Sequence, residues 1–120
     1  MMEIVKSFTF DAAHRMPTKG PDHAYGRMHG HSFAVEVTLK GEPDETYGWI
    51  EDLGVVAEAL ADVRARLDHQ LLNEIEGLET PTLENLCLWI AAELKPRLPQ
   101  LAAVKVGRPT IGEACQYNIP

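Results

Sequence analysis

Two stretches in which apolar and polar residues alternate constrain the fold of this chain most strongly. In residues 29–40, one parity holds Phe33, Val35, Val37 and Leu39, and the other holds Ser32, Glu36, Thr38 and Lys40. In residues 3–14, one parity holds Ile4, Phe8, Phe10, Ala12 and His14, and Lys6 breaks the pattern once. Successive side chains of a strand point to opposite sides, so both stretches are predicted strands with one buried face. We expect them to pair antiparallel across the Pro-, Gly- and His-rich loop 16–28.

Two amphipathic segments in the middle of the chain predict helices. The first follows Asp52, a residue type favoured at helix N-caps, and should end near Asp68. Its apolar residues recur at spacings of three and four: Leu53, Val56, Leu60, Val63 and Leu67. The second opens at Pro81-Thr82 and is stopped by Pro96, and residues 104–108 and 114–118 then predict a hairpin. This order is typical of an α+β fold in which a four-stranded antiparallel sheet carries both helices on one face.

The composition limits the classes of function. A chain of 120 residues, 45% of them hydrophobic, fits one domain spanning residues 1–120. A formal charge of -7 argues against a nucleic-acid partner, because such binding depends on clustered Lys and Arg. No apolar stretch approaches the roughly 20 residues of a membrane span, so we expect a cytoplasmic protein that binds a small molecule and no membrane. Cys87 and Cys115 form no Cys-x-x-Cys pair and are interpreted as structural thiols.

Three histidines form the candidate functional site. His29 and His31 are two residues apart on a predicted strand, so they share its apolar face, and His14 lies on the apolar parity of its own strand. Imidazoles gathered on a covered face lose solvation unless each finds a partner, and one metal ion satisfies all three. Zinc fits this set and keeps a fourth position open, although iron, nickel and copper also accept imidazole. The alternative is that each histidine simply hydrogen-bonds to the backbone.

Five blocks of the sequence resemble the 6-pyruvoyl/6-carboxytetrahydropterin synthase family. They are FDAAHRM (10–16), HGHSF (29–33), WIED (49–52), LDHQLLN (67–73) and PTLEN (81–85). Their order is the family's, and they are most similar to bacterial 6-carboxytetrahydropterin synthases of the queuosine pathway. The resemblance implies zinc on His14, His29 and His31 and the tunnelling fold (T-fold). It also implies a homo-oligomer, a trimer or a hexamer of two trimers, with active sites between subunits.

The resemblance also implies residues that move protons. In the family, zinc acidifies the hydroxylated side chain of 7,8-dihydroneopterin triphosphate, and a cysteine four residues before the first metal histidine acts as base with an Asp-His pair. Asp68-His69 matches that pair, although both residues could instead merely end the first helix. Tyr25 stands in place of the cysteine. A phenol has an ordinary pKa near 10 against about 8.5 for a thiol, so Tyr25 either serves as acid/base on a different substrate or fills pocket volume.

A second departure concerns the glutamate that binds the pterin's N–H groups in the family. Alignment on the strand valines places Arg108 at that position. An arginine has only donors, so it suits a carboxylate, phosphate or carbonyl, unless it is a solvated charge at a strand end. Glu113 is expected to compensate only if the hairpin is rearranged.

Both departures favour a scaffold and zinc site used on another molecule. We therefore expect a zinc-dependent lyase or cyclase-type enzyme acting on a small polar, non-pterin substrate. One alternative is a genuine 6-carboxytetrahydropterin synthase, and another is a non-catalytic, zinc-containing, ligand-binding oligomer.

Overall fold

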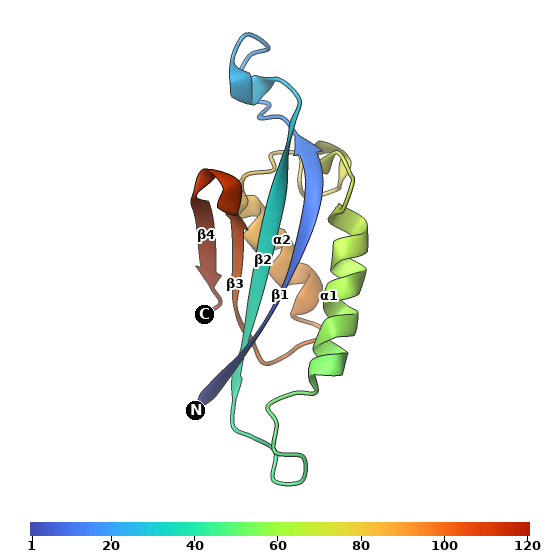
Figure 1. Cartoon of the computed structure of the whole chain (residues 1–120), viewed down its shortest axis with the longest axis vertical. Coiled ribbons are helices and arrows are strands. Elements are labelled where there is room, and N and C mark those ends of the chain that lie inside the picture. The colour runs from blue at the N-terminus through green and yellow to red at the C-terminus, as the bar shows by residue number, and fades with distance from the viewer.

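The chain folds into four strands and two helices, and the computed structural model describes it from residue 1 to residue 120. In chain order the elements are β1 (Met2–His14), β2 (His29–Gly41), α1 (Leu53–Leu67), α2 (Leu83–Leu94), β3 (Leu101–Arg108) and β4 (Glu113–Asn118). The strands form one antiparallel sheet in the order β1-β2-β3-β4, and both helices cover the same face of it (Figure 1). The predicted α+β architecture is confirmed.

β1 and β2 form a long hairpin whose register brings their apolar parities together. The pairing runs without interruption from Met2 opposite Gly41 to His14 opposite His29. Within it Phe10 lies opposite Phe33, and the two rings stack with centroids 4.8 Å apart. The core between sheet and helices therefore leads directly into the histidines at one end of the hairpin.

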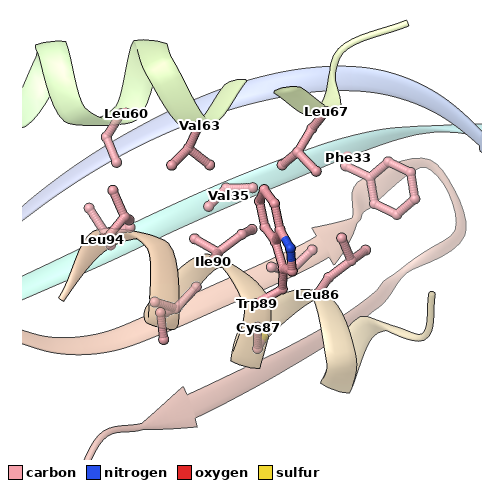
Figure 2. Close-up of a cluster of buried hydrophobic side chains, with 14 of the residues drawn as sticks. Phe33, Val35, Leu60, Val63, Leu67, Leu86, Cys87, Trp89, Ile90 and Leu94 are labelled. Carbon is pink, nitrogen blue, oxygen red and sulfur yellow. The ribbon is translucent and has the colours of Figure 1, made fainter. Parts of the chain in front are cut away.

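The helices begin at capping side chains and bury their apolar faces on the sheet. Asp52 Oδ1 accepts a hydrogen bond from the Gly54 N–H at 2.7 Å, and Thr82 Oγ1 accepts one from the Asn85 N–H at 3.1 Å. Figure 2 shows side chains of both helices and of β2 meeting in this core: Leu60, Val63, Leu67, Leu86, Cys87, Trp89, Ile90, Leu94, Phe33 and Val35. Leu53, the first residue of this apolar periodicity, is 47% exposed, because it starts α1 before the buried face begins at Val56.

A tight turn joins β3 to β4 beside the histidines. Residues 109–111 form a 3-10 turn, and Gly112 follows with φ of 67°, a left-handed conformation that glycine adopts without steric cost. The resulting register pairs Arg108 with Glu113. Cys87 Sγ donates to the carbonyl oxygen of Cys115 at 3.4 Å, and burial raises the pKa of Cys87 to about 12. Both thiols are free and help α2 pack on β4.

The second face of the sheet has no covering layer within one chain (Figure 1). It carries exposed polar side chains such as Glu36 and Lys105, which lie opposite each other on β2 and β3. β1 and β4 are the edge strands. The helices, 15 and 12 residues long, lack the combination of length and apolar character needed to cross a bilayer.

Candidate metal centre

Three histidines converge where β1 ends and β2 begins. Their ring nitrogens can be chosen so that one from each of His14, His29 and His31 lies within 4.8 Å of the others. The Nε2 atoms of His14 and His29 are 3.0 Å apart. His14 is only 1% exposed, although it is polar, and it is the single buried polar residue of the chain. The predicted convergence of the three imidazoles is therefore present.

Backbone carbonyls orient two of these rings. His14 Nδ1 lies 3.1 Å from the carbonyl oxygen of Pro81, and His29 Nδ1 lies 2.7 Å from that of Arg27. A carbonyl can only accept, so each Nδ1 carries the hydrogen and donates it. Each Nε2 is then left with a lone pair directed toward the cluster. Holding the second ring nitrogen in this way is the usual arrangement behind a metal-binding histidine.

The electrostatic setting favours the neutral form of His14 and His31. Burial lowers the pKa of His14 to about 4, and electrostatic repulsion among the clustered histidines and from Arg108 adds to this effect. Burial is also the main reason that the pKa of His31 is lowered, and Arg108 contributes again. His31 Nε2 is buried and has no hydrogen-bond partner. Neutral imidazole is the form that binds zinc, so the donor set, its orientation and this orphaned nitrogen all fit a zinc ion.

A cavity of about 260 Å³ opens over the cluster and also brings Tyr25 and Arg108 to it. The first turn of α2 contributes Glu84, and β4 contributes Glu113. Arg108 Nε lies 3.1 Å from Glu113 Oε1. The expectation that Glu113 needs a rearranged hairpin is wrong, because the ordinary register already places it opposite Arg108. Counting across the four-residue turn 109–112 would have found this pair from the sequence.

Tyr25 lies at the rim of this cavity. It belongs to a short 3-10 turn, Ala24–Gly26, and is 57% exposed. Its N–H donates to His23 Nδ1 at 3.0 Å, and its carbonyl accepts from the Met16 N–H at 2.7 Å. The two backbone contacts fix the turn and leave the phenol free to approach a ligand in the cavity.

Asp68 and His69 form a second constellation, separate from the metal cavity. His69 Nδ1 lies 2.9 Å from Asp68 Oδ2, and the Asp11 N–H donates to Asp68 Oδ1 at 3.0 Å. That backbone hydrogen bond is the main reason that the pKa of Asp68 is lowered; His69 and Arg64 add to it. His69 has φ of 59°, uncommon for a residue with a Cβ, and its side chain is 79% exposed.

This pair also ends α1, as the simpler interpretation expected, because Asp68 is the C-cap and its N–H donates to the Arg64 carbonyl. His69 lines a larger hollow of about 750 Å³, which shares only His31 and Ile111 with the metal cavity. Within one chain, then, Tyr25 and Arg108 join the histidines, and Asp68 does not.

A four-stranded antiparallel sheet with two helices on one face and three histidines at its end defines a T-fold protein with a candidate metal centre. The sequence model of the family described as 6-pyruvoyl tetrahydropterin synthase matches residues 3–120, and the chain belongs to this family. The solved structure of 6-pyruvoyl tetrahydropterin synthase from Caenorhabditis elegans has the same fold, with a TM-score of 0.85 and 24% identity over 99% of this chain and 96% of that one.

Two curated relatives carry different activity names. One, from Synechocystis sp., is named 6-carboxy-5,6,7,8-tetrahydropterin synthase and is 38% identical over 100% of this chain and 95% of its own length. The other, from Pyrococcus furiosus, is named dihydroneopterin monophosphate aldolase and is 31% identical over 97% of this chain and 93% of its own length. Similar chains of this family thus carry the names of a synthase and an aldolase.

Proposed function

We propose that this protein is a zinc-dependent lyase that acts on the hydroxylated side chain of a dihydropterin. The observation that carries this proposal is the cavity in which three imidazoles, Tyr25 and the Glu113 carboxylate lie together. His14, His29 and His31 would hold the ion. A zinc ion there supplies a Lewis acid that lowers the pKa of a hydroxyl in the substrate.

Tyr25 is the proposed proton donor and acceptor at the mouth of the cavity. Its exposed phenol can approach a substrate from the solvent side of the cavity, whereas the histidine rings contact the substrate from the protein side. Tyr25 lines the same cavity as Arg108, and its O–H can donate to or accept from a substrate oxygen there. An acid/base role fits this position better than pocket filling, because a side chain that is 57% exposed fills little buried volume.

Asp68 and His69 are proposed to complete the site of a neighbouring subunit. Asp68 fixes one ring nitrogen of His69, so the other is free to accept or return a proton. The ring is exposed, and Asp68 lies outside the metal cavity of its own chain. The pair would then act in the cavity of a second copy, as the trimer or hexamer implied by the family resemblance requires.

Glu113 is the residue that favours a dihydropterin as the substrate. A pterin presents neighbouring N–H donors that need an acceptor, and Glu113 supplies one beside the histidines although Arg108 stands at the glutamate position of the family. Two relatives named for pterin chemistry support the same class. Arg108 itself favours a second candidate, a small anionic substrate that is not a pterin, because it is the cavity's one guanidinium.

One experiment tests the proposal. Zinc-loaded protein is incubated separately with 7,8-dihydroneopterin triphosphate and with the monophosphate, and the pterin products are identified by chromatography and mass spectrometry. We expect turnover of at least one, loss of zinc and activity in His29→Ala, and a large fall in kcat in Tyr25→Phe. Tyr47→Phe is the matched control, since Tyr47 is also exposed but lies outside the cavity.

The possible outcomes separate the alternatives. Zinc binding with neither binding nor turnover of either compound would reject the pterin proposal and favour the second candidate. Equal activity of Tyr25→Phe and Tyr47→Phe would remove Tyr25 from the mechanism. A metal-bound protein that binds dihydropterins but transforms none would instead be the non-catalytic oligomer.

A further inference from the structure

Arg108 is the only lysine or arginine that lines the metal cavity. Its side chain is 16% exposed, and its Nε is buried without a properly aligned hydrogen bond although Glu113 Oε1 lies 3.1 Å away. A guanidinium can make five donor contacts in a planar fork, and it matches carboxylate and phosphate oxygens best when two contacts form side by side. The contact with Glu113 therefore leaves much of this capacity unused.

Glu113 is held less firmly than its partner. Its side chain is 49% exposed, three times the exposed fraction of Arg108. It is the first residue of β4, directly after the turn, and it belongs to an edge strand. Ion pairs with one solvated member are weak, because water competes for the charge. Glu113 can therefore leave Arg108 at low cost, whereas Arg108 stays in the cavity.

Arg108 and a metal ion held by the histidines would place two positive charges in one cavity. Arg108 lines the same cavity as His14, His29 and His31, so its charge lies close to any ion that these rings hold. An ion held by the three imidazoles would feel repulsion from Arg108. A ligand that carries negative charge and touches both would relieve this repulsion, so it would bind more tightly when the metal is present, and the metal would bind more tightly with the ligand.

We propose that the Arg108–Glu113 pair is an exchangeable anion site, in which a small oxyanion, a carboxylate or a phosphate, takes the place of Glu113 on Arg108 and lies between Arg108 and the metal. Glu113 is then an internal competitor that holds the site closed to weak anions. The exchange also frees the Glu113 carboxylate to accept hydrogen bonds from another part of the same ligand. The site thus selects molecules with an anionic group and a neighbouring N–H donor edge.

This inference needs only one part of the proposed function, the binding of a metal by the three histidines. The probes are inorganic phosphate and acetate, titrated by calorimetry into zinc-loaded protein and into protein stripped with a chelator that is then removed. Metal content is measured first. Two variants probe the pair, Arg108→Gln and Glu113→Gln. Glu84→Gln is the matched control, because Glu84 lines the same cavity but forms no ion pair with Arg108.

We expect phosphate, acetate or both to bind zinc-loaded protein, and the stronger of the two identifies the oxyanion class. Glu113→Gln should tighten that binding roughly threefold to fivefold, the upper part of the range expected when a competing partly exposed ion pair is removed. Arg108→Gln should weaken it at least tenfold, and Glu84→Gln should change it less than twofold. Stripping the metal should weaken binding in wild type.

Several results would overturn the inference. It fails if Glu113→Gln binds the anion no more tightly, if Arg108→Gln binds it as well as wild type, or if Glu84→Gln matches Glu113→Gln. Failure of the proposed function looks different, because it appears as absent zinc or absent turnover. A protein that holds zinc and turns over a dihydropterin, but binds anions independently of Arg108, would reject the exchangeable site alone.

Discussion

Acidification should lower the free energy of unfolding of the metal-free protein, mainly because His14 is buried. Burial lowers the pKa of this histidine from 6.5 to about 4. As the pH falls below 6.5, His14 is protonated in the unfolded chain but stays neutral in the folded protein. The contribution of His14 to the free energy of unfolding is therefore fully present above pH 6.5, and it is lost as the pH falls from 6.5 toward 4. The full difference corresponds to about 3 kcal/mol. Between pH 7 and pH 5 the loss in the free energy of unfolding is about 2 kcal/mol.

Urea unfolding in the presence of a chelator at pH 7, 6 and 5 measures this effect. The comparison is with His14→Gln, which keeps a polar side chain able to reach the Pro81 carbonyl but does not titrate. Its pH dependence should be clearly smaller than that of wild type, although His31 leaves a remainder in the same direction. Asp68 does not interfere, because its pKa is lowered from 3.8 and it loses its contribution only at more acidic pH. An unchanged pH dependence in His14→Gln would refute the assignment of a buried neutral imidazole.

Three further outcomes follow from the fold and the site. In urea unfolding, Leu86→Ala should lower the free energy of unfolding by roughly 2–5 kcal/mol, because Leu86 is 0% exposed. Leu88 is 50% exposed on the same helix, so Leu88→Ala should change the free energy of unfolding by about 0.5 kcal/mol or less. Asp52→Ala removes the cap of α1 and should cost about 1 kcal/mol in the same assay, with Asp52→Asn close to wild type. Asp68→Asn should leave zinc content unchanged and lower kcat by roughly a hundredfold, with little change in KM; loss of zinc instead would place Asp68 in the metal site.

Local patterns predicted most of the fold. The parities of residues 3–14 and 29–40 placed both strands and their buried faces, and Asp52 and Pro81-Thr82 marked both helix starts. The same parity predicted that the three histidines lie on the buried face of the sheet. Once the two strands are paired with their apolar faces on the same side, only the register between them is undetermined. The register, with His14 opposite His29, completed the cluster.

What local patterns missed depends on contacts between distant segments. Asp68 is bound by the backbone of Asp11, 57 residues earlier in the chain, and no spacing rule relates the two. The left-handed backbone of His69 follows from the same docking, because its N–H donates to the Asp11 carbonyl at 2.6 Å. Asp68 ends α1 as its C-cap and also holds His69 Nδ1, so ending the helix and orienting the ring are compatible in one residue.

The arginine at position 108 changes meaning once its cross-strand neighbour is known. If Arg108 stands at the position of the family's glutamate, as the resemblance in sequence predicts, the replacement taken alone removes an acceptor and shifts the local charge by two units. With Glu113 directly opposite, an acceptor is present, and the pair is neutral where a lone glutamate would carry one negative charge. An Arg108→Glu substitution would place two carboxylates there instead, which would make the cavity two charge units more negative. The guanidinium of Arg108 favours a substrate with negative charge near the reacting side chain, so Arg108→Glu should weaken the binding of ligands that carry phosphate or carboxylate groups close to the histidines.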